Sequence, residues 1–349
     1  MKTLTIGIPS YNVENYIAEC LDSILLPELV DDLEVLVIND GSTDGTEAVA
    51  REYEKLFPET VRVISKENGG WGSGVNLAIS EARGKYFKNL DSDDFVSPEG
   101  FTELVRNMKE NDADAFIAPA NNYEEGTARV YPHQFPNGCI FGRVVPFSEM
   151  CGSIDFIFRM HCLAFRTEML QKNNIRVDEC FYSDLELISY PFEYVNTVYA
   201  QEEPVNMYRI GRNGQSMSIA SMAKHIPDIE RVGRNMISWY LDAEKRIDDP
   251  AKLAFCEKLA KISVSSYLLQ PSTADNGSSY IPELREYKKN VLDASERLSD
   301  LSGYSFFAAK VLKSNFNNYA FWGEMWKLSL GKAAKTASKL WNFTRKFKH

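Results

Sequence analysis

The sequence predicts an α/β fold: a mostly parallel sheet covered by helices, followed by a helical C-terminal region. Two observations in the first 120 residues support this. Short apolar runs alternate with segments whose apolar residues recur at helical spacing. Polar residues also cluster directly after three of the apolar runs. Such alternation is typical of strand-helix-strand units, whose strands run parallel.

The apolar runs predict five strands in this part of the chain. They cover residues 4–8, 33–38, 61–64, 85–90 and 113–118. Helices are predicted between them, the first from the apolar spacing of residues 17–25. Ser97 followed by Pro98 predicts the start of another helix, because Ser caps helices and Pro is favoured at their first position.

The second half of the chain is predicted to be less regular at first and then helical. Residues 121–158 have the composition of loops and short strands. Helical patterns dominate after residue 221. We therefore predict a sheet domain at residues 1–220 and a helical region with a basic aromatic tail at 221–349.

Charge and composition limit the class of partners. The net charge of −10 argues against a general nucleic-acid-binding protein. Residues 301–349 nevertheless contain nine Lys or Arg and one Glu, with Trp and Phe between them. This composition suits a helix on an anionic membrane surface. Packing of the tail on the body of the protein or on a second subunit in a homodimer is equally open.

Cysteine usage and the N-terminus predict a cytoplasmic protein. The six cysteines contain no CxxC pair, and only four histidines are present, so the pattern does not indicate a structural zinc site. Residues 1–8 lack the features of a signal peptide, and no apolar run reaches the length of a membrane span.

A group of carboxylates follows the fourth predicted strand at Asp91, Asp93 and Asp94. Carboxylates this close repel one another, and a bound cation removes that cost. Oxygen ligands of this kind favour Mg²⁺ or Mn²⁺. A solvated turn that caps the next helix is the alternative; the position after an apolar strand favours the metal.

Three other positions are candidates with open alternatives. Asp40, after the second strand, can accept hydrogen bonds from a base or ribose, or simply form an Asx turn. Asp184 lies among apolar neighbours that would raise its pKa, as suits a general base, but it can also begin a helix. Arg209 can pair with diphosphate oxygens or lie in a charged loop.

Taken in order, these pieces resemble the family 2 glycosyltransferases of the GT-A fold. The matching stretches are Ile8 to Asn12, Asn39 to Asp44, Asn68 to Asn76 and Leu90 to Asp94. Two departures from the family pattern occur. Asn39 replaces the first Asp of the usual Asp-Asp-Gly-Ser, and Ser183 replaces the Glu that usually precedes the catalytic Asp.

The resemblance implies a role for each matched residue. Residues assigned to the nucleotide-sugar donor are Pro9, Tyr11, Asp40, Asn68, Gly69, Asn76, Asp91 and Asp93. Asp93 and Asp94 would bind the divalent metal, Mn²⁺ or Mg²⁺, and Asp184 would be the catalytic base of an inverting reaction. His161 and Arg209 are assigned to the acceptor side, although a buried structural His is an alternative for His161.

The implied reaction moves a sugar from a nucleotide-diphosphate donor, with UDP favoured by family habit, to a hydroxyl of a saccharide or lipid-linked acceptor. Synthesis of a surface polysaccharide or glycolipid, at the inner face of the membrane, would suit the basic tail. A nucleotidyltransferase is a competing hypothesis, but it calls for a lysine-bearing glycine loop after the first strand, which residues 9–13 do not supply. A non-catalytic nucleotide-sugar-binding module is the other alternative.

Overall fold

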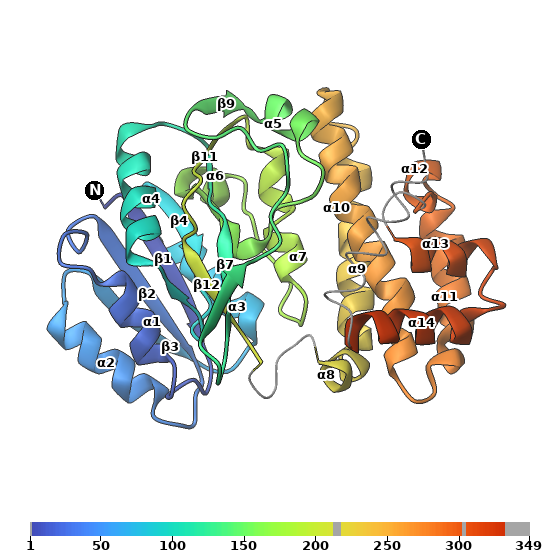
Figure 1. Cartoon of the computed structure of the whole chain (residues 1–349), viewed down its shortest axis with the longest axis horizontal. Coiled ribbons are helices and arrows are strands. Elements are labelled where there is room, and N and C mark those ends of the chain that lie inside the picture. Colours follow the sequence, from blue (N-terminus) through green and yellow to red (C-terminus); the bar gives the residue numbers. More distant parts are fainter. Residues whose placement is uncertain (1, 212–217, 302–304, 332–349) are drawn as a thin grey trace. The chain divides into compact units, whose positions relative to one another are not determined.

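A sheet of eight strands forms the centre of the N-terminal part of the chain in the computed structural model (Figure 1). The structure describes residues 2–211, 218–301 and 305–331. The strand order is β3-β2-β1-β4-β10-β6-β11-β9. The strands are β1 (Leu4–Ser10), β2 (Leu33–Asp40), β3 (Val61–Lys66), β4 (Tyr86–Asn89), β6 (Ala115–Ile117), β9 (Val144–Pro146), β10 (Leu163–Arg166) and β11 (Thr197–Ala200).

The sheet is mostly parallel, as the sequence predicts, and the five expected strands are present. β1 pairs in parallel with β2 and with β4, β2 with β3, and β6 with β11. β10 lies antiparallel between β4 and β6. This insertion was not predicted, because sequence pattern does not reveal where a distant strand joins a sheet.

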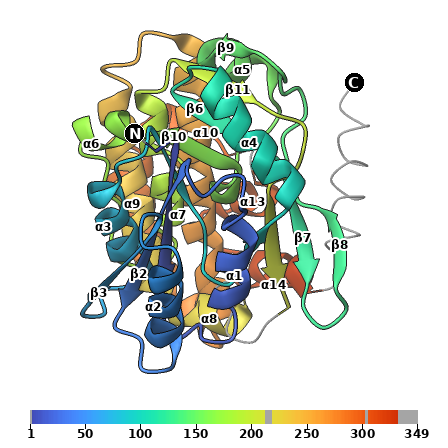
Figure 2. The same cartoon turned by 90° about the vertical axis from the view of Figure 1, so that its left-hand side faces the viewer.

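Helices cover both faces of this sheet (Figure 2). α1 packs against α2 and α4, whereas α3 packs against β1 and against α6. Ser97 caps α4 as predicted, accepting a hydrogen bond from the Gly100 N–H at 3.1 Å. The helices are α1 (Ile17–Ile24), α2 (Thr46–Leu56), α3 (Trp71–Glu81), α4 (Pro98–Glu110), α5 (Phe147–Ser153), α6 (Thr167–Lys172) and α7 (Asp184–Leu187), with short 3₁₀ turns η1 (Met160–Cys162) and η2 (Tyr190–Glu193).

A second sheet of four strands lies next to the aspartate motif. Its order is β5-β12-β7-β8. β5 (Phe95–Val96) directly follows the aspartates and pairs with β12 (Asn206–Ile210). β7 (Ala120–Glu124) and β8 (Arg129–Pro132) complete the sheet. The aspartate motif is therefore fixed by β4 before it and by β5 after it.

The chain divides into two compact units. Unit 1 comprises residues 1–213 and 243–256, and unit 2 comprises residues 214–242 and 257–349. The boundary that we predicted after residue 220 stays a prediction. The core of unit 1 joins buried strand residues such as Ile6, Ile8 and Val35 to Ile17 and Leu21 of α1.

Unit 2 consists of helices and short helical turns. A buried pair of rings, Tyr267 and Tyr287, packs edge to face at 4.6 Å inside it. None of the described helices is long and apolar enough to cross a bilayer. The elements in and around unit 2 are α8 (Ile219–Lys224), α9 (Ile226–Ala243), α10 (Pro250–Leu269), η3 (Gln270–Thr273), η4 (Gly277–Tyr280), α11 (Ile281–Tyr287), η5 (Lys288–Leu292), α12 (Glu296–Ser299), α13 (Phe306–Lys313) and α14 (Tyr319–Gly331).

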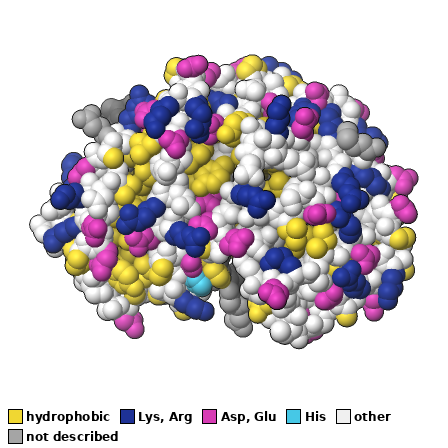
Figure 3. Space-filling model, turned by 180° about the vertical axis from the view of Figure 1, so that it is seen from behind, with side chains coloured by type: hydrophobic (Ala, Val, Ile, Leu, Met, Phe, Trp, Pro, Cys, Tyr) yellow, Lys and Arg dark blue, Asp and Glu magenta, His cyan; other side chains and the backbone are white. Residues whose placement is uncertain are grey.

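The surface mixes charges of both signs. On the face seen in Figure 3, acidic and basic side chains alternate over short distances, and hydrophobic side chains are exposed between them. The basic tail predicted to contact a membrane falls mainly on residues 332–349, which lie outside the described residues.

Two helical glycines provide a matched test of how closely α4 packs. A Cβ on Gly100 would lie 1.9 Å from the carbonyl oxygen of Pro204, whereas a Cβ on Gly152 of α5 would meet nothing within 4 Å. Gly100→Ala should therefore lower the free energy of unfolding by about 1–3 kcal/mol through overpacking. Gly152→Ala should raise it by about 0.5–1 kcal/mol through helix propensity. Urea denaturation measures both; equal effects of the two substitutions would contradict the packing described.

Candidate active site

The carboxyl ends of β1, β2 and β4 meet at one edge of the large sheet. Ser10 is in register with Asn39, and Gly7 with Asn89. The polar segments that follow these three strands therefore lie side by side, as expected for ligand sites in parallel sheets. Pro9 is buried at the end of β1, and the side chain of Tyr11 is 51% exposed just beyond it.

Asp40 organises the glycine-rich turn before α3. Its carboxylate accepts hydrogen bonds from the backbone N–H groups of Gly69 and Gly70, at 2.9 and 2.8 Å, and forms an ion pair with Lys66 at 2.6 Å. The Asn68 side chain donates to the Asp40 carbonyl oxygen at 2.8 Å. The structure thus brings together Asp40, Asn68 and Gly69, which the sequence assigns to the donor. Lys66 is a partner that sequence analysis missed.

Asn76 ties α3 to the segment that leads to Asp184. Its side-chain oxygen accepts from the Val177 N–H at 2.9 Å, and its side-chain nitrogen donates to the Val177 carbonyl oxygen at 2.8 Å. A Cβ on Gly72 would lie 2.0 Å from the Asp178 carbonyl oxygen, so only glycine permits this approach. The amide of Asn76 is thereby engaged with backbone, and its predicted contact with a nucleotide stays a prediction.

The aspartate motif is held by donors from three elements. Asp91 accepts hydrogen bonds from the indole N–H of Trp71 at 3.0 Å and from the Asn89 amide at 3.2 Å. Burial raises the pKa of Asp91 to about 6, with a further contribution from Asp93. One oxygen of the buried Asp94 accepts from the Arg209 backbone N–H at 2.8 Å. Burial, reinforced by Asp91 and Asp93, raises the pKa of Asp94 well above its usual range.

The fold brings the Asp184 segment to this motif although it is far away in the sequence: the Ser183 hydroxyl lies 3.1 Å from the position of a Cβ on Gly72, and the adjacent Trp71 binds Asp91. The charge of Asp184 is among those that raise the pKa of Asp91 and of Tyr208. Burial raises the pKa of Asp184 itself, and the nearby guanidinium of Arg159 acts in the opposite direction. Asp184 is the first residue of α7, following Ser183 and the positive-φ residue Tyr182.

Arg209 anchors the aspartate motif from β12. Its guanidinium donates to the Asp93 carbonyl oxygen at 2.8 Å and forms ion pairs with Glu19 and Glu125. It also lies over the rings of Tyr16, Phe95 and Tyr123. Only 4% of Arg209 is exposed, so the described contacts are those of an internal support. The contact with an acceptor that we predicted for Arg209 stays a prediction.

His161 belongs to a cluster of rings next to the site. Its ring stacks on Tyr208 at 5.1 Å and meets the edge of His133 at 4.6 Å. Burial lowers the pKa of His161 well below its usual range, so the imidazole is neutral at physiological pH. Its Nε2 is buried and has no hydrogen-bond partner within the described chain. The predicted contact of His161 with an acceptor remains untested.

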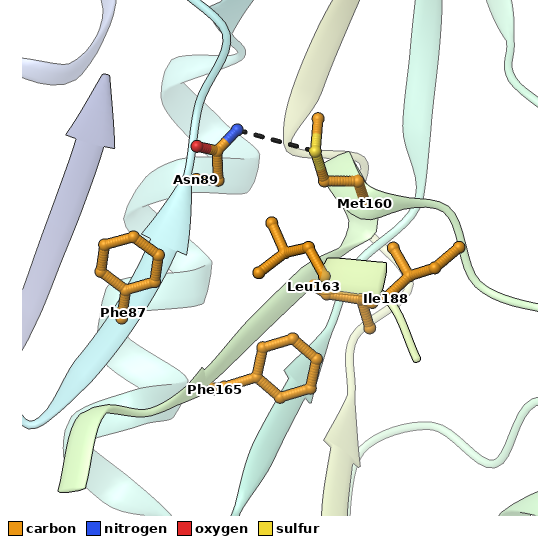
Figure 4. Close-up of a pocket in the computed structure, with 7 residues that line it drawn as sticks. Phe87, Asn89, Met160, Leu163, Phe165 and Ile188 are labelled. Carbon is orange, nitrogen blue, oxygen red and sulfur yellow. Dashed lines mark hydrogen bonds between the residues drawn. The ribbon is translucent and has the colours of Figure 1, made fainter. Parts of the chain in front are cut away.

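Several residues of the site were not predicted. Trp71 and Asn89 fix Asp91 by hydrogen bonding, and the positive charge of Arg159 acts on Asp184. Asn89 also approaches the sulfur of Met160 at 3.7 Å, above a small cavity with apolar walls (Figure 4).

Lys88 is an unexpected cation inside the sheet. It is 3% exposed, and its ammonium donates to the His161 carbonyl oxygen at 2.7 Å. Burial lowers the pKa of Lys88 to about 8, while Cys162, Asp94 and Asp91 act in the opposite direction. A buried ammonium therefore lies within electrostatic range of the aspartate motif.

The lowered pKa of Lys88 predicts a particular dependence of stability on pH. Between about pH 8 and its ordinary pKa of 10.5, the unfolded chain binds more protons at this site than the folded chain, so stability rises with pH. Lys88→Met removes this titrating group. Over this pH range, the free energy of unfolding of the wild type should therefore rise by at most about 3 kcal/mol relative to that of the variant. Urea denaturation of both proteins between pH 7 and 10.5 measures the difference; parallel curves would refute the shift.

Comparison with known proteins agrees with this geometry. A family model described as glycosyl transferase family 2 matches residues 5–175. The chain is 31% identical over 221 residues to the uncharacterised glycosyltransferase EpsJ of Bacillus subtilis, covering 60% of this chain and 62% of EpsJ. It is 48% identical over 96 residues to the chondroitin synthase of Pasteurella multocida, covering 28% of this chain and 10% of that enzyme.

Solved structures show the same fold. The S. aureus protein TarS, residues 1–349, crystallised with UDP-GlcNAc, has a TM-score of 0.66 at 19% identity, covering 94% of this chain and 92% of that one. The likeness in fold confirms the α/β, GT-A class expected from the sequence. Together, the family match over the strand-end motifs and the likeness in fold identify residues 5–175 as a glycosyl transferase family 2 region within a chain of GT-A fold.

Proposed function

We propose that this protein is a metal-dependent, inverting glycosyltransferase that moves a sugar from a nucleotide-diphosphate donor to a hydroxyl acceptor. The observation that carries the proposal is the approach of the segment that ends at Asp184 to α3: the Ser183 hydroxyl lies 3.1 Å from the position of a Cβ on Gly72, and the adjacent Trp71 donates to Asp91 at 3.0 Å. An inverting transfer needs both: one carboxylate that takes a proton on the attacking side, and a charged site for the leaving diphosphate.

The donor would bind along the ends of β1, β2 and β4. Structures similar to this chain hold nucleotides: TarS with UDP-GlcNAc and with UDP, and a Pyrobaculum calidifontis mannosyltransferase with GDP-Man and Mn²⁺. We propose a UDP-sugar as donor, contacted by Tyr11 and Asp91 and by the turn that Asp40 organises. The exposed ring of Tyr11 offers a face on which a base can stack.

The residues present fit a divalent cation. Asp93 and Asp94 would hold it, and the cation would offset the negative charge that develops on the departing diphosphate. The second carboxylate oxygen of Asp94 is buried and has no hydrogen-bond partner in the described chain. No group of three or more His, Cys, Asp or Glu side chains among the described residues could hold a metal ion. Mg²⁺ is usually bound by one or two carboxylates together with substrate phosphates, so Asp93 and Asp94 would hold the cation only jointly with the diphosphate of the donor.

Asp184 would act as the base. Burial raises its pKa, and the positive charge of Arg159 restrains that rise, which favours an ionised carboxylate able to take a proton. The acceptor oxygen, losing its proton to Asp184, would form a bond to the anomeric carbon as the bond to the diphosphate oxygen breaks. Attack from the face opposite the leaving group inverts the configuration.

The acceptor and location are proposed from the tail and from relatives. Among these, the teichoic acid poly(glycerol phosphate) polymerase of Staphylococcus epidermidis is 30% identical over 203 residues, covering 27% of its length. We propose surface polysaccharide or glycolipid synthesis at the inner face of the membrane. In unit 2, Phe306, Phe321 and Met325 are exposed and Lys310 lies over the Phe306 ring, a combination suited to an anionic bilayer. A homodimer remains the alternative use of this surface.

The role of Asp184 predicts a separation of turnover from donor binding. Asp184→Asn should reduce sugar transfer by about 10²–10⁴-fold, the usual contribution of a general base. Its affinity for UDP should stay within about twofold of wild type, because Asp184 is proposed to face the acceptor. Glu179→Gln, which removes one exposed carboxylate from the same segment, is the control and should retain full activity. Equal turnover in Asp184→Asn and wild type would remove Asp184 from the mechanism.

The proposed metal site predicts that Mn²⁺ strengthens the binding of UDP. UDP should raise the melting temperature of the wild type more in the presence of Mn²⁺ than in its absence, because a ligand that binds only the folded state stabilises it. Asp93→Asn should lose the Mn²⁺-dependent part of this increase, whereas Asp184→Asn should keep it. Differential scanning fluorimetry of the three proteins with UDP, each with and without Mn²⁺, measures the six cases. An unchanged Mn²⁺ effect in Asp93→Asn would contradict the assignment.

A further inference from the structure

Arg159, directly before η1, is a half-buried guanidinium whose described partners are all neutral. It donates to the side-chain oxygen of Gln134 at 3.3 Å and lies over the Phe156 ring at 5.4 Å. Its Nε is buried and has no hydrogen-bond partner within the described residues. By contrast, Arg62 and Arg166 in the same unit form ion pairs with carboxylates. Arg159 is thus a cation with unused donors.

The strongest charged neighbour of Arg159 is the proposed base. Asp184 is the nearby carboxylate that most favours the charged form of Arg159, and Arg159 in turn favours the ionised form of Asp184. Yet no guanidinium nitrogen of Arg159 lies within 4.0 Å of an Asp184 oxygen, although both residues are described. Arg159 and Asp184 therefore do not form a direct ion pair.

Arg159 lies on the acceptor side of the site. The charges of Asp91, Asp93 and Asp94 act on Tyr208, as does the charge of Asp184. Of these four carboxylates, only Asp184 is a significant influence on Arg159. Arg159 directly precedes η1, which packs against α7, the helix that begins at Asp184, so the guanidinium belongs to the side of the site that carries the proposed base.

A second donor faces the same region. The ring of Tyr208 stacks on His161 of η1, two residues after Arg159, and the charge of Asp184 acts on its hydroxyl. Its hydroxyl forms no hydrogen bond with the residues that the structure describes. His133, whose ring packs edge to face with that of Tyr208, is uncharged at neutral pH because burial lowers its pKa to about 4.

We propose that Arg159, together with the Tyr208 hydroxyl, binds an anionic group of the acceptor, a phosphate or a carboxylate, and thereby directs the acceptor hydroxyl towards Asp184. The planar fork of a guanidinium matches the oxygens of both groups. The ligand would supply the counter-charge that Arg159 lacks. This inference rests on the proposed function, because it names the chemical class of that enzyme's acceptor.

The test compares charged and neutral probes on full-length protein in the presence of UDP. Isothermal titration calorimetry would measure glycerol 1-phosphate against glycerol, and glucuronic acid against glucose. Wild type should bind at least one anionic probe about tenfold or more tightly than its neutral counterpart, the usual effect of a charge-assisted hydrogen bond. Preference for glycerol 1-phosphate would indicate a phosphate-bearing acceptor, and preference for glucuronic acid would indicate a uronic acid.

Two variants at Arg159 and one control complete the test. Arg159→Gln should abolish the preference, and Arg159→Lys should keep part of it, because Lys retains the charge without the fork. Arg83→Gln removes an exposed positive charge elsewhere in unit 1 and should keep the full preference. UDP affinity, measured on the same samples, should be unchanged in all three and reports that they are folded.

Three results would overturn the proposal. They are equal binding of charged and neutral probes by the wild type, a preference that survives in Arg159→Gln, and a loss of UDP affinity in Arg159→Gln while its melting temperature is unchanged. The last would place the guanidinium on the donor diphosphate instead. Failure of the wild type itself to bind UDP is a different result, which would refute the proposed function.

Discussion

The structure depends on gathering carboxylates, partly out of water, at one edge of a parallel sheet. Asp91, Asp94 and Asp184 all have raised pKa values, chiefly because burial disfavours their charged forms. Such an arrangement is costly unless it is compensated. Trp71 and Asn89 compensate Asp91 by hydrogen bonding, and the Arg209 backbone does so for Asp94. The remaining repulsion is what a bound cation would relieve.

The second half of unit 1 completes the site through a few specific contacts. The amide of Asn76 clamps Val177, and the absence of a side chain at Gly72 lets Asp178 approach α3. These contacts fix the segment that ends at Asp184. Arg209 performs the equivalent task on the other side, joining β12 to the Asp93 backbone. Asn76 and Arg209, which the sequence motifs assign to ligand binding, thus also hold the site together. Substituting them would therefore affect folding as well as binding.

The sequence was informative where a local pattern determines the structure. Five strands, the Ser97 cap and the convergence of polar strand ends follow from apolar periodicity and from the geometry of parallel sheets. The antiparallel β10 and the four-stranded second sheet did not follow, because both depend on pairing between distant segments. For the same reason, Arg159 and Lys88 were missed: a charged residue's role depends on what the fold places beside it.

The most direct measurement is a crystal structure of the protein grown with UDP and Mn²⁺, with anomalous scattering used to locate the metal. Our account predicts an anomalous peak within coordination distance of the Asp93 carboxylate and of a diphosphate oxygen. It also predicts Asp184 on the opposite side of the sugar-binding space. A metal bound away from Asp93, or UDP bound away from the ends of β1, β2 and β4, would contradict it.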